Sequence, residues 1–492
     1  CFTGDLVSPN ILDSPRFQTL LQLTGVDSDN LPTSELIEQA IDKRCQIHQT
    51  KTADSLRSVQ FACVSQELKD TLDPDVKHVS FSAHYIEGWI YHHMMISSHT
   101  IYTEQVTDEA CWTELRTSAL QSCAPTATVI EVINQLTGVR RLPGFYQLER
   151  QSGGGLQHIP TGQMSYASLL DQAVISAVER CGDELMDIIT TASKLVVTSH
   201  QIDWECDTSN ARELPWFRQL TIIGKTVNMT ETVKAVFESL GLADEFLTED
   251  QRKQLSVVVD VLRPFQEVAE RIRSNGNVTC SLAFASIRLL KSALIDYSQA
   301  YPDHSLIKYL TEEFQNATDS IDNGEENSYT TATILDPRFK LQWCEAVKQE
   351  SFKRGLIESA KQAVKKHEAA AEEVSRPVFP PQTTGGFFTR ILKQQPEADI
   401  VTSNITSEAF RYFEESLMPE DCDIMQYWKN NQSNYPNLSV LAQRYLSIPT
   451  SPSDISGYYD TECQLFDIHN TNISGDILNK AIELRPSITQ SH

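Results

Sequence analysis

Two short motifs have residue types suited to phosphate or metal binding, but neither has the spacing that this chemistry needs. Residues 224–226 read Gly-Lys-Thr, like the end of a phosphate-binding loop, yet the glycine that opens such a loop is replaced by Gln219. His92 and His93 lie in a strand-like segment, where adjacent side chains point to opposite faces and cannot share one metal ion. The glycines at 153–155 precede no helix with a clear N-cap, and we interpret them as a loop. We therefore expect no nucleotide, metal or other cofactor.

The cysteine pattern bears on the class of protein. Eleven cysteines are scattered over 492 residues without a CxxC pair, which argues against a zinc finger within this chain. They are too sparse for a disulfide scaffold, so we expect free thiols in a reducing compartment. Seven Asn-x-Ser/Thr sequons would matter only in a secreted glycoprotein, and the cysteine pattern disfavours that class.

The charge of the chain bears on its partners. Lys and Arg total 41 and Asp and Glu total 66, which gives a formal net charge of −25. Affinity for nucleic acid depends on cationic side chains that displace counterions, so we expect this chain alone to bind DNA weakly. The charge and the absence of a long apolar run also predict no membrane partner. Because the chain begins at Cys1, we expect it to be part of a longer protein.

The hydrophobic pattern changes along the chain and divides it into four parts. A short helical region is followed by a segment in which apolar and polar residues alternate, with a predicted hairpin at Gly88. Apolar residues then repeat at helical spacing as far as a linker rich in proline and glycine, after which helical patterns resume. The four predicted parts are 1–57, 58–164, 165–402 and 403–492.

Two segments are more specific than these patterns. Residues 331–340 read TATILDPRFK, and residues 427–449 contain YWKN, YPNL, LA and RYLSIP in that order. Both resemble segments of the hAT superfamily of DNA transposases, whose patterns are AT-x-LDPRFK and the opening of the C-terminal dimerisation region. Residues 261–265 (VLRPF) and 82–86 (SAHYI) resemble two further segments of that family. Their order and spacing make chance a poor explanation.

The resemblance implies a fold. We expect an α/β protein with an RNase H-like core, in which a mixed sheet carries flanking helices. A large all-helical domain is inserted before the last helix of that core. The resemblance implies that 58–164 form the first part of the core, that 165–402 form the all-helical insertion, and that 403–492 complete the core and form a helical dimerisation segment.

The resemblance also implies the place of an active site, where three carboxylates hold two divalent cations. This chain has Val64 in the slot of the first aspartate, Glu149 in or next to the second, and the shorter Asp454 in place of the third, a glutamate. Val227 stands where the family has a base-stacking tryptophan. These departures predict a protein that is not an enzyme and has no catalytic residues or metal site.

One alternative stays open at this stage. The chain is an active metal-dependent RNase H-like transposase or nuclease if acids beyond the first predicted strand replace the missing ligand. Asp70, Asp73 and Asp75 are the candidates. RNase H-like chemistry requires the acid on the strand itself, which favours the inactive interpretation.

The remaining expectations concern partners. We expect a homodimer, because large aromatic residues crowd the C-terminal segment and such residues are typical anchors of an interface. The resemblance further implies a nuclear, chromatin-associated transcription regulator. Such a protein contacts DNA only through zinc fingers upstream of this chain and binds chromatin or transcription regulatory proteins. Leu441 and Leu446 are expected in the core, whereas the predicted interface consists of Tyr427, Trp428, Tyr435, Leu438, Tyr445 and Ile448.

Overall fold

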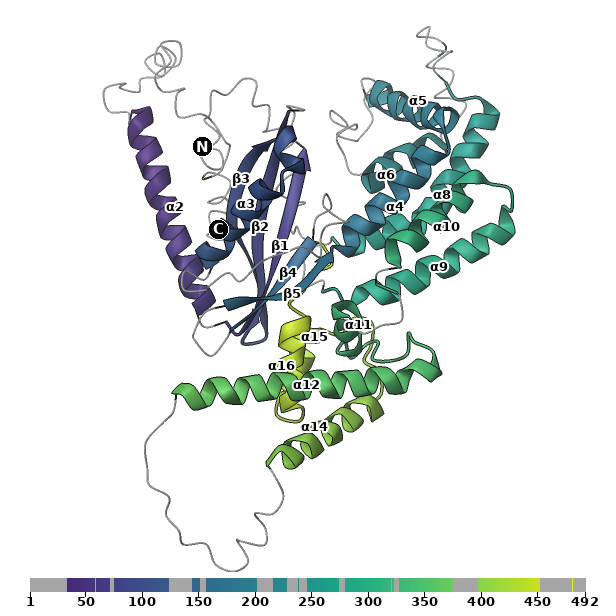
Figure 1. Cartoon of the computed structure of the whole chain (residues 1–492). Coiled ribbons are helices and arrows are strands. Elements are labelled where there is room, and N and C mark those ends of the chain that lie inside the picture. Colours follow the sequence, from purple (N-terminus) through teal and green to yellow (C-terminus); the bar gives the residue numbers. More distant parts are fainter. Residues whose placement is uncertain are drawn as a thin grey trace, which may run out of the picture.

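The computed structural model shows a twisted sheet, a helical body beside it and a C-terminal group of helices below both (Figure 1). The structure describes residues 33–57, 59–70, 75–123, 144–150, 156–200, 216–227, 238, 246–273, 279–319, 321–322, 327–374, 397–451 and 480. The loop predicted at 153–155 therefore lies outside the described residues, as does most of the linker predicted before residue 402.

The sheet has five strands in the order β3-β2-β1-β4-β5. Every pair of neighbouring strands is antiparallel. The parallel pairing that a mixed sheet requires does not occur among these strands, so the expected mixed sheet differs from the one described here. The strands are β1 (Phe61–Asp70), β2 (Val76–Glu87), β3 (Ile90–Tyr102), β4 (Gly144–Arg150) and β5 (Leu156–Met164).

The predicted hairpin at Gly88 is confirmed, since β2 and β3 pair with each other on either side of it. Gly88 and Trp89 have φ values of 59° and 63°, which lie in the left-handed region. Glycine adopts this region freely, whereas tryptophan loses of the order of 1 kcal/mol there. Burial offsets that cost: the Trp89 ring stacks 6.2 Å from Trp428, and its Nε1 donates to Gln432 Oε1 at 2.9 Å. The tip of the hairpin is thereby fixed to the C-terminal helices.

One face of the sheet is apolar and is covered by helices α2 (Ser34–Arg57) and α3 (Glu109–Cys123). The 3-10 helix η3 (Thr103–Thr107) leads from β3 to α3. Alternate strand residues such as Val64, Phe81 and Ala83 pack against Leu56 and Trp112 of these helices. The described part of the region 1–57 is therefore helical, as the sequence predicts.

The opposite face of the sheet carries polar side chains, three of which are joined by hydrogen bonds. Ser65 Oγ lies 2.7 Å from His84 Nε2, and His84 Nδ1 lies 2.9 Å from the Tyr91 hydroxyl. The His84 ring also stacks on His93, with 4.7 Å between the ring centroids. A neutral imidazole supplies one donor and one acceptor, which suits His84 to two hydroxyl partners.

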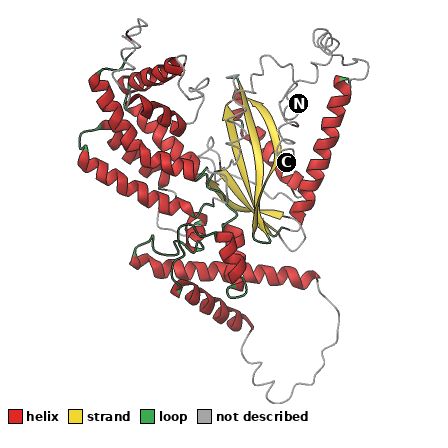
Figure 2. Cartoon of the chain, turned by 180° about the vertical axis from the view of Figure 1, so that it is seen from behind, coloured by secondary structure: helices red, strands yellow, loops and turns green. Residues whose placement is uncertain are grey.

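Among the described residues, six helices form the body beside the sheet. Figure 2 shows this body from behind. The longest of these helices shows how the sequence forms such a helix: Thr248 and Gln251 make a capping box at its start, and Leu255, Val258 and Leu262 form its buried stripe. The six helices are α4 (Tyr166–Arg180), α5 (Asp183–His200), α6 (Trp216–Val227), α8 (Glu249–Arg271), α9 (Leu282–Ala300) and α10 (Ser305–Thr318).

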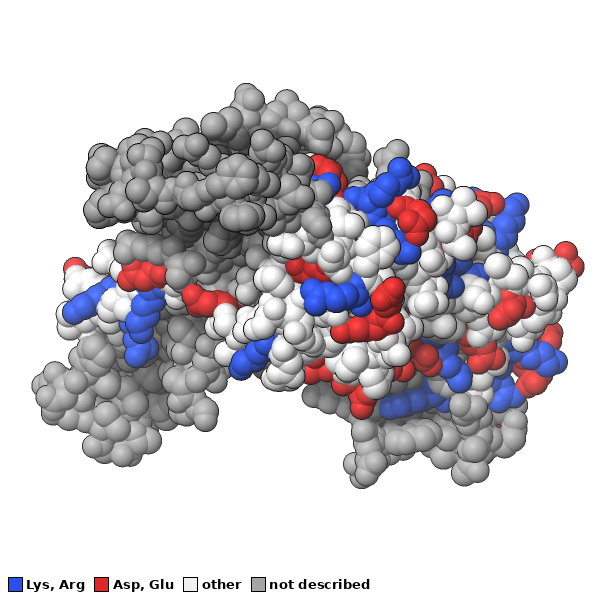
Figure 3. Space-filling view, turned by 90° about the horizontal axis from the view of Figure 1, so that it is seen from below, with Lys and Arg blue, Asp and Glu red and all other residues white. Residues whose placement is uncertain are grey.

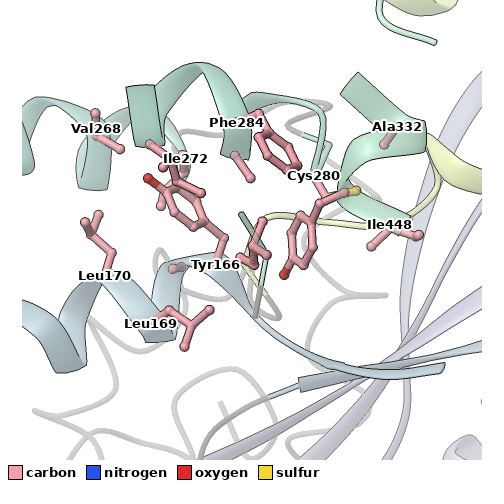
Figure 4. Close-up of a cluster of buried hydrophobic side chains, with 14 of the residues drawn as sticks. Tyr166, Leu169, Leu170, Val268, Ile272, Cys280, Phe284, Ala332 and Ile448 are labelled. Carbon is pink, nitrogen blue, oxygen red and sulfur yellow. The ribbon is translucent and has the colours of Figure 1, made fainter. Parts of the chain in front are cut away.

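The C-terminal group packs under the sheet and against this body. Helix α16 contacts α12 and also β1 and β2. One continuous core joins the helical body to the C-terminal group, and Figure 4 shows its part around Tyr166, Phe284 and Ile448. The predicted boundary at residue 402 falls inside a helix, and the division into four domains stays a prediction. The helices of this group are α11 (Ser328–Ile334), α12 (Ala346–Val374), α14 (Glu397–Glu414), α15 (Ile424–Asn431) and α16 (Pro436–Tyr445).

The buried histidine pair predicts a loss of stability in acid. Burial lowers the pKa of His93 to about 4, and burial, with His93 as neighbour, lowers the pKa of His84 well below its usual value. Below a pH of about 6.5 the unfolded chain binds protons that the folded chain excludes, so stability is complete above that pH and falls toward pH 4. At pH 5 we expect His93 alone to remove about 2 kcal/mol of the free energy of unfolding. Urea unfolding at pH 7 and pH 5 measures this loss, and His93→Gln should make the pH dependence shallower. Equal pH dependence in the two proteins would contradict the role of His93.

Candidate functional site

The slot of the first catalytic aspartate lies in the hydrophobic core. Val64 is 1% exposed in the centre of β1, where it pairs with Ala83 of β2 and Tyr146 of β4. Its side chain belongs to the apolar cluster under α2 and α3. A carboxylate at this position would be buried without a partner, which costs several kcal/mol.

The other two slots do not complete a site in the described structure. Glu149 lies on β4 and pairs with Phe61, three residues along β1 from Val64, which is about 10 Å at the usual rise of a strand. Asp454 lies outside the described residues. Within the described part of the chain, no group of three or more His, Cys, Asp or Glu side chains is arranged to hold a metal ion. The prediction of an inactive site stays a prediction.

The alternative ligands are placed only in part. Asp70 is the last residue of β1, Asp73 lies outside the described residues, and Asp75 is an exposed residue in the turn before β2.

The two short motifs that invited a phosphate or metal role have structural positions. Residues 224–226 lie inside α6, and a side chain at Gly224 would meet Val259 of α8 at 3.5 Å. A phosphate-binding loop requires the turn before a helix, so this interpretation fails. His92 stacks on Tyr85 and His93 on His84, which confirms that the adjacent histidines point to opposite faces. Val227 is the last residue of α6 and packs at the edge of a small apolar cluster.

The TATILDPRFK segment instead forms a set of buried hydrogen bonds, beginning with those of Asp336. The Asp336 side chain is 0% exposed, and its carboxylate accepts from Ser281 Oγ at 2.7 Å. It also accepts from three nitrogens of Arg338, namely the backbone N and Nε at 3.0 Å and Nη2 at 2.7 Å. This bidentate geometry is the strongest form of a carboxylate–guanidinium pair. It folds the segment back on itself after α11.

Lys340 connects the same segment to α14. Its backbone has a φ of 47°, and its ammonium group lies 4.6 Å from the centre of the Tyr412 ring. Lys340 Nζ donates to the carbonyl oxygens of Tyr412 at 2.5 Å and Glu415 at 2.9 Å, at the end of the helix. Burial lowers the pKa of Lys340, and the Glu415 carboxylate opposes that shift. A cation at the C-terminal end of a helix satisfies carbonyls that have no partner within the helix.

The C-terminal aromatic residues bond to the TATILDPRFK segment and to one another. Trp428 Nε1 donates to the Leu335 carbonyl at 3.0 Å, and the Tyr412 hydroxyl donates to the Ile334 carbonyl at 2.9 Å. The hydroxyls of Tyr427 and Tyr435 both donate to the Glu415 carboxylate. Burial and this hydrogen bond raise the pKa of both phenols, which therefore keep their protons.

A buried glutamate of α14 caps the start of α16. Glu408 Oε1 accepts from the Leu438 backbone N, and Oε2 accepts from Asn437 Nδ2, both at 2.7 Å. Burial is the main cause that raises the pKa of this carboxyl group. The sequence analysis missed Glu408, Glu415 and Asp336 as structural centres, because an acidic residue in a helix or loop carries no local sign of its partner.

The residues predicted to form the dimer interface are placed inside the chain. Trp428, Leu438 and Ile448 are 0% exposed, and Tyr427 and Tyr435 are also buried, whereas Tyr445 is partly exposed. Leu441 and Leu446 are buried, as expected. In the chain as described, Tyr427, Trp428 and Tyr435 pack in the core. Their role in a dimer stays a prediction.

Among the described residues visible from below, Lys and Arg are interspersed with Asp and Glu (Figure 3). Several of these charges form exposed pairs along single helices, such as Lys353 with Glu350 and Lys361 with Glu358. Such pairs neutralise each other, so these described charges add little to the attraction of a phosphate backbone. No helix among the described residues has the length and apolarity that a membrane span requires.

Comparison with known proteins places the C-terminal part of the chain. Residues 408–483 match the hAT family C-terminal dimerisation region. The chain carries this region. The match begins in α14 and includes α15 and α16. Helices α14 and α15 form hydrogen bonds with the TATILDPRFK segment, and α16 contacts α11.

The chain is also homologous to zinc finger BED domain-containing proteins. It is 26% identical over 282 residues to the protein DAYSLEEPER of Arabidopsis thaliana, a match that covers 53% of this chain and 38% of that protein. It is 21% identical over 252 residues to zinc finger BED domain-containing protein 4 of Homo sapiens, which covers 50% of this chain and 21% of that protein. A third relative is RICESLEEPER 3 of Oryza sativa subsp. japonica, with 27% identity over 168 residues. The chain thus spans well under half the length of these relatives.

The geometry around Asp336 predicts a large effect on stability. Asp336→Ala removes the acceptor of Arg338 and Ser281 inside the core, and we expect the free energy of unfolding to fall by about 3–5 kcal/mol. Asp260→Ala is the matched control, because it removes an exposed pair with Arg263 and should cost at most about 1 kcal/mol. Urea unfolding compares the two variants. Similar losses in the free energy of unfolding of both variants would contradict a larger contribution from the buried pair.

Proposed function

We propose that this chain is a catalytically inactive, transposase-derived domain that acts through protein interaction and dimerisation. The observation that carries the proposal is the position of Val64. The slot that must hold the first metal-binding carboxylate is filled by a valine packed between Ala83 and the helices α2 and α3. An RNase H-like origin of the sheet is part of this proposal, as are the all-helical insertion at 165–402 and the absence of catalysis.

The match to the hAT dimerisation region supports self-association. The core positions of Trp428 and Leu438 leave two ways to form a dimer. Either the C-terminal helices exchange between two copies and make the same contacts with the partner, or the copies meet through side chains that stay partly exposed, such as Tyr445. Both arrangements keep the contacts between the TATILDPRFK segment and the C-terminal helices.

The setting of this function is proposed from the relatives. These relatives are named zinc finger BED domain-containing proteins. We propose that this chain is likewise part of a nuclear regulator of transcription on chromatin, in which upstream zinc fingers contact DNA and this acidic domain binds regulatory proteins. We further propose that the chain corresponds to the C-terminal region of a vertebrate C2H2 protein resembling zinc finger protein 618, in which case the upstream fingers are of the C2H2 type.

Self-association is tested on the unmodified chain. We expect light scattering at micromolar concentration to give about twice the 55.4 kDa of one chain. Tyr445→Ala should shift the mass toward the monomer, because this aromatic side chain is the partly exposed member of the predicted interface. Tyr301→Ala, an exposed tyrosine outside the matched region, is the control and should leave the mass unchanged. A 55 kDa species for the unmodified chain would contradict dimerisation.

The absence of catalysis is tested with metal. We expect Mg²⁺ and Mn²⁺ to bind no more tightly than to any acidic surface, because Val64 supplies no ligand. Isothermal calorimetry should show no saturable site. A stoichiometric micromolar site that disappears in Glu149→Gln would instead favour the alternative, an active metal-dependent transposase or nuclease.

A further inference from the structure

The start of α12 presents an apolar side chain to solvent without packing it. Val347 is 91% exposed, which is the highest value among the large exposed apolar residues of the described chain. It belongs to the first turn of the helix, directly after the turns that follow the TATILDPRFK segment. The Val347 side chain is too exposed to stabilise the core, so any function that it has requires contact with another molecule.

The residues around Val347 form a short pattern of a known chemical kind. Residues 347–350 read Val-Lys-Gln-Glu, an aliphatic residue, a lysine, a variable residue and an acid. Conjugating enzymes for small ubiquitin-like modifiers bind this pattern directly. The aliphatic side chain contacts an apolar surface, the lysine extends to the catalytic cysteine, and the acid pairs with a basic group. In all 492 residues, no other lysine has an aliphatic residue before it and an acid two positions after it.

The structure presents these four residues in the way that such an enzyme needs. Val347, Lys348 and Glu350 are exposed, and the Glu350 side chain is 72% exposed beside Lys353. Gln349 is the variable position of the pattern. Its Nε2 donates inward to the carbonyls of Leu341 at 3.3 Å and Cys344 at 3.5 Å. The one residue that the enzyme does not read is therefore the one that faces the protein.

The backbone at this position can also adapt to an enzyme groove. The first backbone N–H groups of a helix lack partners within the helix, and helix ends fray more readily than helix centres. The Lys348 N–H donates at 2.9 Å to the carbonyl of Glu345, which precedes the helix. Extending residues 347–350 thus disturbs one turn and none of the contacts around Asp336.

We propose that Lys348 is an acceptor site for covalent attachment of a small ubiquitin-like modifier. The modifier arrives as a thioester between its C-terminal glycine and the cysteine of the conjugating enzyme, formed beforehand by an ATP-dependent activating enzyme. Lys348 Nζ, after loss of a proton to water, attacks the thioester carbonyl. A C–N bond forms, the C–S bond breaks, the cysteine leaves as thiolate, and the remaining extra proton on nitrogen passes to solvent. The product is an isopeptide bond.

The test uses the full chain with purified modifier, activating enzyme, conjugating enzyme and ATP. We expect a conjugate of one modifier per chain on a denaturing gel, and a branched peptide at Lys348 by mass spectrometry. Lys348→Arg should abolish this conjugate while keeping the charge and the helix, and Glu350→Gln should reduce it strongly. Lys253→Arg is the matched control, because Lys253 is 70% exposed near the start of α8 but has Arg252 and Leu255 at the two positions that the enzyme reads.

Two results would overturn the proposal. One is unchanged conjugation of Lys348→Arg. The other is an unmodified chain under conditions in which a control peptide with the same pattern is converted. Attachment of ubiquitin but not of the small modifier would also count against it. None of these outcomes depends on dimerisation, so this site and the proposed function stand or fall separately.

Discussion

The contacts of residues 334–340 are the constraint on which the rest of this structure depends. The segment buries a carboxylate, an ammonium group and two backbone carbonyls, and each of them has at least one partner outside the segment. Asp336 is satisfied by Arg338 and Ser281, Lys340 by the end of α14, and the Leu335 carbonyl by Trp428. A buried polar group costs free energy unless it is bonded, so removing one partner leaves the others in an unfavourable state. The C-terminal helices are therefore part of the core and not an appendage.

The same region joins the sheet to the helical body. The Trp89 ring, at the tip of the β2–β3 hairpin, stacks on Trp428, and helix α16 contacts β1 and β2. After α16 the chain passes along the start of α9, where Cys280 N donates to the Ile448 carbonyl at 2.8 Å. The Thr450 hydroxyl then donates to the carbonyl of Ile272 at the end of α8. Elements that are far apart in the sequence thus contact one another at residues in or next to the segments that resemble the transposase family.

Hydrogen bonding and burial occupy several polar residues in the described part of the chain. His84, Glu408 and Glu415 are used as hydrogen-bond partners inside the structure, and burial raises the pKa of the thiols of Cys63 and Cys280. A thiol with a raised pKa is a weak nucleophile. The positions that could act on other molecules are on the surface, where exposed side chains such as Val347 and Lys348 have no part in the core.

The sequence by itself determined the local features: the hairpin at Gly88, the opposite directions of His92 and His93, the helical stripe of Leu255 and Val258, and the family resemblance of two segments. The hairpin, the histidine directions and the helical stripe follow from backbone periodicity, because the order of residue types fixes which side chains share a face. Tertiary structure decided the rest. Periodicity does not give strand direction, so the antiparallel pairing of β4 with β1 could not be derived from it. Nor could the pattern tell whether Trp428 and Tyr435 fill the core of one chain or anchor a second. A cluster of aromatic residues in the sequence indicates that these side chains will be buried. Only the three-dimensional arrangement shows which surface buries them.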